Sequence, residues 1–344
     1  MKRNAVCLFV AVVCLFLAAV WLRRSCWHRR LIPSFQRLDK NVTSGEFIEA
    51  PVDDFNSRSD RIRQTCLKYK RALLGSHYLG TRSNYRLGRP AHCPPRQCPI
   101  FVDHSHRIAF CFVPKVASTS VKSLFATLLN ISHPSDNNGN ATSSDAIHKS
   151  FNAKVLRVGP SHFPRSRLKS YTRAMFVRHP FERLVSAFVD KAGKPRSAEQ
   201  FFYDVYWDKA LAGLKTNGSS TAMTFSLFVD YLLTRPDAEW DDHWAPYYSR
   251  CEPCLFDYDV IGKLETGDRD FGILFSRMGI KGGDLVPRKN TRRTGDGGGE
   301  GGTRNNKSAK DYFAELSSSQ VMRLYGRYFY DFELFGYDLK GYLR

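Results

Sequence analysis

With 344 residues, 42% of them hydrophobic, the chain can bury the core of one ordinary domain with additional segments, or of two domains at most. This content excludes a chain too polar to fold. Lys and Arg together number 52 against 33 Asp and Glu, a formal net charge of +19. So large a charge predicts an acidic partner, which could be nucleic acid, an anionic membrane surface or a polyanionic substrate. The alternative is a soluble protein whose basic surface is simply solvated.

Residues 5–22 (AVCLFVAVVCLFLAAVWL) carry no charge and reach about the minimum length of a membrane-spanning helix. No clean small-residue cleavage site follows, which favours an uncleaved signal anchor over a removable signal peptide. Lys2 and Arg3 precede the segment but four arginines follow it, so the positive-inside rule alone would place the remaining chain in the cytoplasm. We expect a lumenal orientation instead, because other features of the chain favour it.

Four parts are therefore expected: a short cytoplasmic tail over 1–4, a transmembrane signal anchor over 5–22, a stem over 23–99 and a lumenal globular domain over 100–344. The stem is polar and rich in Arg, Ser, Asp and Pro, with one short helix predicted over 61–74. An irregular N-terminal subdomain is the alternative for this region.

The segment Arg107–Leu129 (RIAFCFVPKVASTSVKSLFATLL) combines a strand, a basic turn and a helix. Its apolar run over 108–113 predicts a buried strand, and apolar residues recur at helical spacing from Val121 onwards. A strand that enters a helix through a Lys-bearing turn is a natural anion site, because the free N–H groups and the dipole at the helix start favour negative charge. Ser118–Ser120 add hydroxyl donors and a candidate N-cap. A capped core helix beside a lysine is the alternative.

The same design recurs at Ala174–Val189 (AMFVRHPFERLVSAFV). A strand predicted over 174–177 ends at Arg178, which can grip a phosphate with two parallel hydrogen bonds. Helical spacing resumes at Phe181, and Ser186 lies further along that helix. Two such turns predict a ligand with two separated phosphate-like groups. The sequence lacks the G-x-x-x-x-G-K-[ST] loop, which counts against an ordinary ATPase or GTPase.

The rest of the chain continues the alternation of strands and helices. The further predicted elements are a polar loop over 132–144, helices over 197–214, 224–234 and 310–330, a strand over 260–261, a flexible glycine-rich run over 295–302 and an aromatic segment over 329–343 that docks on the core. This order indicates an α/β fold with a central, mainly parallel sheet flanked by helices.

Two features favour the lumen. N-x-S/T sequons, the acceptors of N-glycosylation, occur at Asn41, Asn130, Asn140, Asn217 and Asn306. Beyond Cys26, an even set of cysteines remains: Cys66, Cys93, Cys98, Cys111, Cys251 and Cys254. In an oxidising compartment these could form three disulfides, in about fifteen alternative pairings. The Cys251-x-x-Cys254 pair could instead bind zinc or act as a redox pair, but it lacks a second ligand pair and the usual flanking context.

Several motifs in one order resemble the Golgi carbohydrate sulfotransferases, most closely the branch of the chondroitin and dermatan 4-O-sulfotransferases and the HNK-1 sulfotransferase. The segment PKVASTS (114–120) resembles their 5′-phosphosulfate loop, and RHPFERLVSAF (178–188) resembles their 3′-phosphate motif. The likeness continues through DHWAP (242–246), CEPC (251–254) and YDVIGKLET (258–266), and it ends in DFELFGY (331–337).

The resemblance implies a single-pass type II Golgi membrane enzyme with a P-loop-like sulfotransferase fold. Its donor would be 3′-phosphoadenosine 5′-phosphosulfate (PAPS), with no metal required. The 5′-phosphosulfate would be held by Pro114, Lys115, Val116, Ala117, Ser118, Thr119 and Ser120. The 3′-phosphate motif would comprise Arg178, His179, Pro180, Phe181, Glu182, Arg183, Leu184, Val185 and Ser186, with Arg178 and Ser186 on the phosphate itself. The acceptor would be the 4-position of N-acetylgalactosamine in chondroitin or dermatan, or alternatively a terminal glucuronyl or N-acetylgalactosamine epitope.

The chain departs from the family pattern in two places. The family usually has Cys-Thr-Asn-Trp where this chain has Ser-Thr-Ser-Val at 118–121, and it usually has Glu at the position of His179. Thr119 is retained, so we expect donor binding to be intact. The missing tryptophan is expected to change packing near the acceptor.

Sulfuryl transfer requires in-line positioning, positive charge at the leaving oxygen and a base for the acceptor hydroxyl. Lys115 is the candidate for the leaving group. His148 is the first candidate base, because it aligns with a histidine that follows the first helix in this family; His243, in the predicted acceptor cleft, and Glu182 are its rivals. The basic run over 288–293 could contact an anionic glycan or be a solvated loop.

Three other classes compete with this hypothesis. A non-catalytic lumenal protein that binds acidic glycans would share the charge but ignore the nucleotide. A nucleotide kinase is disfavoured by the missing Walker loop and the predicted anchor, and a nucleic-acid binder by the anchor and the sequons. The expected partners are therefore an anionic glycan and the Golgi membrane.

Overall fold

The computed structural model describes residues 53–70, 72–73, 99–131, 144–158, 170–212, 223–280 and 307–343. Outside these residues lie the predicted anchor (5–22), the glycine-rich run (295–302), the basic run (288–293), Cys93, Cys98 and the sequons at Asn41, Asn140, Asn217 and Asn306. Within the described ranges, no helix has the length and apolar content needed to cross a membrane. Asn130 is exposed just after a helix, with a φ of 51°.

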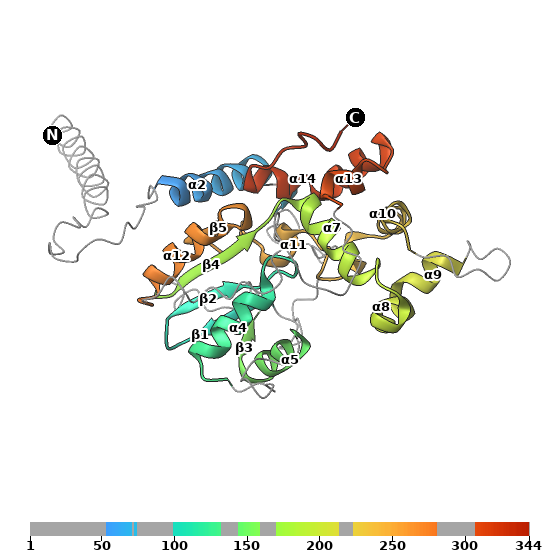
Figure 1. Ribbon diagram of the computed structural model, residues 1–344. Coiled ribbons are helices and arrows are strands. Elements are labelled where there is room, and N and C mark those ends of the chain that lie inside the picture. The colour runs from blue at the N-terminus through green and yellow to red at the C-terminus, as the bar shows by residue number, and fades with distance from the viewer. Residues whose placement is uncertain are drawn as a thin grey trace, which may run out of the picture. The chain divides into compact units, whose positions relative to one another are not determined.

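One sheet of five described strands organises the fold, in the order β3-β1-β2-β4-β5 (Figure 1). The strands are β1 (Ile100–Asp103), β2 (Ile108–Cys111), β3 (Leu156–Val158), β4 (Thr172–Val177) and β5 (Val260–Lys263). Neighbours β2, β4 and β5 are parallel, whereas β1 is antiparallel to β2 and β3. The three predicted strands are confirmed as β2, β4 and β5. The sheet is nevertheless mixed, because β1 and β3 add antiparallel pairings that the sequence pattern does not predict.

Helices follow the parallel strands as expected. Those connected directly to strands are α4 (Ser118–Leu128), α5 (Ser144–Lys154), α7 (Pro180–Lys191) and, after the turn η6 (Leu264–Thr266), α12 (Gly267–Arg277). The helix predicted over 197–214 is a succession of short pieces: η2 (Arg196–Ala198), α8 (Gln200–Phe202), a π-helical turn η3 (Tyr203–Trp207) and α9 (Asp208–Leu211). The remaining elements are α10 (Phe225–Thr234), η5 (Asp237–Glu239), α11 (Tyr247–Cys251), α13 (Ala309–Phe313) and α14 (Ser318–Phe335).

The helix predicted over 310–330 is interrupted, so that α13 and α14 are separate. Ser317 begins a new helix: its hydroxyl accepts from the Gln320 N–H, while the Gln320 side chain accepts from the Ser317 N–H. This reciprocal capping box satisfies two backbone donors at the start of α14. Gly336 ends α14 in the left-handed conformation, with a φ of 62°.

Two apolar clusters support the fold. The first surrounds the sheet and contains tilted and edge-on aromatic rings, such as Phe101, Phe110 and Phe125. The second lies under α7, α10 and α14, and includes the fully buried Trp207 and Trp244. Helix α4 packs in the first cluster and α7 in the second, so each of the two basic turns is fixed to its own part of the core.

Helix α2 (Asp53–Lys68) belongs to this globular unit, although the sequence pattern places it in a stem. Arg58 donates to the Ile261 carbonyl of β5 at 2.8 Å. A disulfide joins Cys66 to Cys254, with their Cα atoms 5.5 Å apart. The boundary expected near residue 99 is therefore wrong for this helix.

A second disulfide links Cys111, the last residue of β2, to Cys251 at the end of α11, with a Cα separation of 6.1 Å. Cys251 and Cys254 thus each bond to a different distant cysteine. They therefore form neither a zinc-binding pair nor a redox pair with one another. The expectation that cysteines of this chain form disulfides is confirmed for these four.

Candidate active site

The two basic turns lie at the same edge of the sheet. Strands β2 and β4 are adjacent and parallel, in register from Ile108 opposite Thr172 to Cys111 opposite Met175, so their carboxyl ends meet. This edge is where open α/β sheets bind their ligands. Arg183, on α7, also joins the turns, because its Nε donates to the Pro114 carbonyl at 3.1 Å.

The phosphate loop, residues 114–120, presents its backbone to this edge. Lys115 and Ala117 have φ values of 70° and 49°, in the left-handed region that non-glycine residues seldom adopt. Ala117 caps α4 and offers no side-chain hydrogen bond, so the expected hydroxyl N-cap at Ser118–Ser120 is wrong. The N-terminus of α4, whose dipole favours negative charge, thus follows two left-handed residues, in the geometry of an anion-binding nest.

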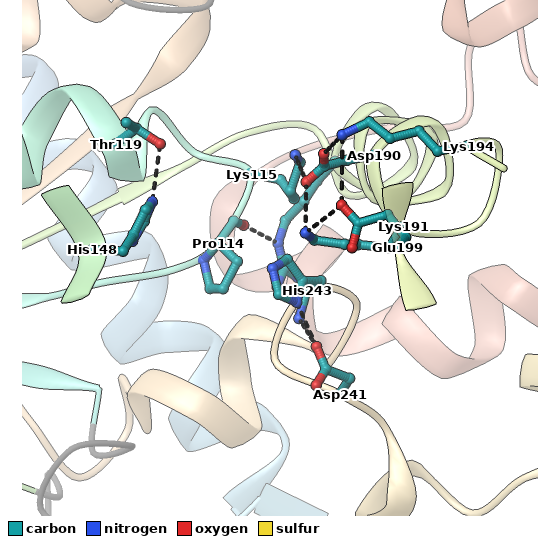
Figure 2. A network of polar contacts seen from close by, with 11 residues as sticks. Pro114, Lys115, Thr119, His148, Asp190, Lys191, Lys194, Glu199, Asp241 and His243 are labelled. Carbon is teal, nitrogen blue, oxygen red and sulfur yellow. Dashed lines mark hydrogen bonds and ion pairs between the residues drawn. The ribbon is translucent and has the colours of Figure 1, made fainter. Parts of the chain in front are cut away.

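Lys115 is paired across the site with α7, as Figure 2 shows. Its Nζ lies 3.0 Å from Asp190 Oδ2, and Lys194 Nζ lies 2.7 Å from the other oxygen of that carboxylate. Lys191 lies 3.4 Å from Asp190 and 3.1 Å from Glu199. Burial lowers the pKa of Lys115, against the opposing effect of Asp190. Burial raises the pKa of Asp190, but Lys115, Lys194 and Lys191 outweigh it and hold that pKa below its usual range.

Sequence reasoning missed this lysine and carboxylate network. The signal that could have found it is the pair of lysines after the 3′-phosphate motif, with Lys191 in the last turn of α7 and Lys194 just beyond its end. Together the network holds three ammonium groups and two carboxylates, an excess of one positive charge beside the phosphate loop.

His148, on α5, braces the phosphate loop. Its Nε2 lies 3.1 Å from Thr119 Oγ1 and its Nδ1 lies 2.8 Å from Lys122 Nζ. An ammonium can only donate, so Nδ1 is the acceptor and Nε2 carries the hydrogen toward Thr119, a tautomer inferred from these partners. Burial, reinforced by the charge of Lys122, lowers the pKa of His148 to about 3. The imidazole is therefore neutral, and its lone pair is engaged by Lys122.

His243 has the opposite arrangement. Its Nδ1 lies 2.5 Å from Asp241 Oδ1, which also accepts from the His243 N–H at 2.9 Å (Figure 2). A carboxylate accepts, so Nδ1 carries the hydrogen and the lone pair sits on Nε2. Burial lowers the pKa of His243 below its ordinary value, and the positive charges of Lys191 and Lys115 add to this, although Asp241 raises it. A neutral imidazole held by a carboxylate is the usual form of a general base.

Arg178 stands at the end of β4, as predicted, with its side chain partly exposed. Its Nε and Nη2 both lie 3.1 Å from Glu182 Oε2, one turn along α7. Its backbone N–H and carbonyl both bond to the Tyr247 hydroxyl, at 2.9 and 3.0 Å. Glu182 thus holds the guanidinium beside the first turn of α7. Ser186, two turns along, is partly exposed on the same helix.

The loop that carries His243 is braced by α14. The Asp331 carboxylate, fully buried, accepts from the N–H groups of Tyr247 and Tyr248 at 2.7 and 2.9 Å, and the Tyr328 hydroxyl donates to the Trp244 carbonyl at 2.6 Å. Burial raises the pKa of Asp331 to about 7. Helix α14 therefore supports the loop that carries His243.

The profile of the Sulfotransferase family matches residues 99–338. The chain belongs to the sulfotransferase family. Carbohydrate sulfotransferase 8 of Mus musculus is 32% identical over 312 residues, which cover 87% of this chain and 70% of that protein. Carbohydrate sulfotransferase 11 of Mus musculus is 31% identical over 256 residues, covering 71% and 68%. Carbohydrate sulfotransferase 9 of Homo sapiens is 29% identical over 246 residues, covering 69% and 53%. No solved structure matches the chain.

The protein is accordingly a carbohydrate sulfotransferase that uses PAPS as its sulfate donor. The residues at the sheet edge fit such a donor. The N-terminus of α4 and Lys115 suit its 5′-phosphosulfate, and Arg178 suits its 3′-phosphate. In the part of the chain that the structure describes, no cluster of His, Cys, Asp or Glu is placed to hold a metal ion.

Several residues predicted to contact the donor instead support the sulfotransferase core. The side chains of Val116, Ser120, Pro180, Phe181, Leu184 and Val185 are buried. Val116 belongs to the cluster around the sheet, and the others lie on the inward sides of α4 and α7. Their side chains fix the helices that carry the site.

Arg183 is also a supporting residue, with 1% of its surface exposed. Besides Pro114, its guanidinium donates to the carbonyls of Ala245 at 2.7 Å and Asp242 at 2.8 Å, and it lies over the Tyr247 ring. Three backbone carbonyls accept hydrogen bonds from its guanidinium, so Arg183 joins the phosphate loop to the His243 loop.

His179 caps α7 rather than facing a phosphate. Its Nδ1 accepts from the Phe181 N–H at 3.2 Å, its Nε2 donates to the Asp338 carbonyl at 2.9 Å, and its ring stacks on Tyr342. Its backbone N–H donates to Glu265 at 2.7 Å. Where the family usually has Glu, this chain thus ties the start of α7 to its C-terminal segment.

Proposed function

We propose that this sulfotransferase transfers a sulfuryl group from PAPS to the 4-position of N-acetylgalactosamine in chondroitin or dermatan, as a single-pass type II enzyme with its catalytic domain in the Golgi lumen. The observation that carries the proposal is the Asp241–His243 pair beside Lys115 and the N-terminus of α4. The net charge of +19 supports a polyanionic acceptor. Relatives at about this identity support glycan sulfation, whereas the sugar and the hydroxyl are our proposal.

Each group at the site has one role in this mechanism. The α4 N–H groups and Thr119, oriented by His148, hold the 5′-phosphosulfate, while Arg178 holds the 3′-phosphate. His243 Nε2 removes the proton of the acceptor hydroxyl as its oxygen forms a bond to sulfur. The bond from sulfur to the 5′-phosphate oxygen breaks, and Lys115 stabilises the charge left on that phosphate. The products are the sulfated glycan and adenosine 3′,5′-bisphosphate.

His243 is the better base of the two histidines. The lone pair of His148 points at the Lys122 ammonium, so it cannot accept a proton until that contact breaks. In His243, Asp241 holds the hydrogen on Nδ1 and leaves Nε2 for the substrate. His243→Ala is expected to lower kcat by about 10²–10⁴-fold. His148→Ala is expected to act mainly through the KM for PAPS. If His148→Ala instead lowers kcat while the titrated affinity for adenosine 3′,5′-bisphosphate is unchanged, and His243→Ala leaves kcat intact, His148 is the base.

The acceptor is tested directly. The full chain is incubated with labelled PAPS and a panel of chondroitin, dermatan and glycans that end in glucuronic acid or N-acetylgalactosamine, and the sulfated disaccharides are identified. Sulfate on the 4-position of N-acetylgalactosamine in chondroitin or dermatan supports the proposal. Sulfate only on a terminal sugar would show that the acceptor is a terminal epitope and not chondroitin or dermatan. Binding of the bisphosphate without any sulfate transfer would contradict catalysis.

A further inference from the structure

A pocket of about 130 Å³ lies next to the His243 loop, between the π-helical turn η3, α9 and the end of α10. The residues of its wall that bear on its chemistry are Tyr206, Lys209, Tyr231, Arg235, Glu239 and Trp244. None of them enters the mechanism above. The wall therefore combines aromatic rings with two cations and one carboxylate.

A row of rings connects this pocket to the proposed base. His243 and Trp244 are consecutive, so one contributes to the site and the next to the pocket. The Phe202 ring lies 5.5 Å from the His243 ring and 5.9 Å from the Tyr206 ring, between centroids. Phe202 and Trp244 are buried, at 7% and 1% exposure, so these packed rings fix the pocket wall relative to the His243 loop.

The pocket is built rigidly and is anchored to the catalytic network. Buried Trp207 lies 5.5 Å from Trp244 and 5.6 Å from Tyr231, between ring centroids. Its indole Nε1 donates to the Lys191 carbonyl at 2.7 Å, at the end of α7. The π-helical turn that presents Tyr206 and Trp207 is a local irregularity of the kind that often marks functional sites.

The charges at the rim select an anion. Lys209 is exposed, and the Arg235 guanidinium lies over the Tyr231 ring at 5.3 Å. Glu239 lies 3.5 Å from Arg235 and opposes an anionic ligand, but two cations leave a net positive rim. Aromatic rings match the apolar face of a sugar, and a guanidinium matches a carboxylate.

We propose that this pocket is an acceptor subsite that binds a uronic acid of the glycan chain, with Lys209 and Arg235 recognising its carboxylate. The assignment rests on the proposed function, because it needs an acceptor made of uronic acid and hexosamine. It predicts that the pocket contributes to acceptor affinity and contributes nothing to donor binding or to the chemical step.

The test uses the full chain in detergent with two probes, a chondroitin hexasaccharide and the same hexasaccharide with its carboxyl groups reduced. The Lys209→Gln, Arg235→Gln double variant is expected to raise the KM for the first probe about tenfold, as for the loss of a charged contact, with kcat and the KM for PAPS unchanged. The wild type should show a similar rise with the reduced probe, and the double variant should show little further loss with it.

Two controls sharpen the result. Arg63→Gln with Lys68→Gln removes two exposed cations from α2 and should leave every constant unchanged. Glu239→Gln should lower the KM for the carboxylated probe, since it releases Arg235. If the wild type sulfates the hexasaccharide and the pocket variant does so with the same KM, the subsite is wrong while the proposed function stands. If the wild type sulfates neither chondroitin nor dermatan, the proposed function fails and the subsite assignment with it.

Discussion

Lys115 of the phosphate loop and Asp190 of the last turn of α7 form an ion pair, with 3.0 Å between Nζ and Oδ2. The pair joins the first basic turn to the helix that follows the second, so it fixes the ammonium at the sheet edge. It also means that a donor must share Lys115 with a carboxylate. Lys194 bonds to the other oxygen of that carboxylate, so Asp190 keeps a partner when Lys115 turns to the donor.

Lys115→Ala is expected to lower kcat by about 10²–10³-fold, because the charge that develops on the leaving phosphate loses its nearest cation. The fold should survive, since the side chain is partly exposed. Asp190→Asn is the matched variant: it keeps the shape, frees Lys115 and should lower the KM for PAPS. Steady-state kinetics with both substrates varied measures these constants, and wild-type turnover in a folded Lys115→Ala protein would refute the assigned role.

Arg178→Ala is expected to abolish transfer by removing the group that holds the 3′-phosphate. Its guanidinium is partly exposed and pairs with Glu182, so the melting temperature should change little. Titration with adenosine 3′,5′-bisphosphate should show weakened binding, whereas adenosine 5′-monophosphate, which lacks the 3′-phosphate, should bind wild type and variant alike. Equal loss for both nucleotides would place Arg178 elsewhere in the site.

Arg183→Leu is expected to act on stability first. It leaves the carbonyls of Pro114, Asp242 and Ala245 without their donor, a loss of about 3 kcal/mol or more in the free energy of unfolding. Arg183→Lys can restore only part of this, because an ammonium lacks the planar fork. Denaturant unfolding measures both. A variant as stable as wild type but unable to bind nucleotide would show that Arg183 contacts the donor after all.

The pH dependence of turnover should report on His243. Protonation removes the base, so kcat is expected to fall as the pH drops through its pKa, and burial places that pKa below the ordinary 6.5. In Asp241→Asn the carboxylate no longer raises the pKa, so the acid limb should shift to still lower pH while the plateau of kcat drops. An acid limb at the same pH in both proteins would exclude His243 as the titrating group.

The parallel part of the fold was predictable because each unit joins an uninterrupted apolar run to apolar residues at helical spacing. The antiparallel strands were not, since β1 and β3 have only four and three residues and no alternation to detect. The break before α14 was hidden for a related reason: the apolar positions continue across it, and only the capping box of Ser317 and Gln320 reveals it.

The candidate site was predictable as residue types near two turns, but their pairing was not. The sequence places Lys115 and Arg178 at turns, and the adjacent parallel strands bring those turns together. The carboxylate that meets Lys115 comes from the far end of α7, and the carbonyls that bury Arg183 come from two distant segments. Such contacts depend on tertiary packing, which no local pattern encodes.

The disulfide between α2 and Cys254 determines how far the chain can be shortened from its N-terminal side without damage to the enzyme domain. A protein shortened to begin at residue 99, where the family match starts, would lose α2 and leave Cys254 as an unpaired thiol. The interior would also lose the side chains of Phe55 and Ile62, of which only 2% and 6% of the surface is exposed. A shortened form suitable for assay must therefore start upstream of Asp53, where α2 begins.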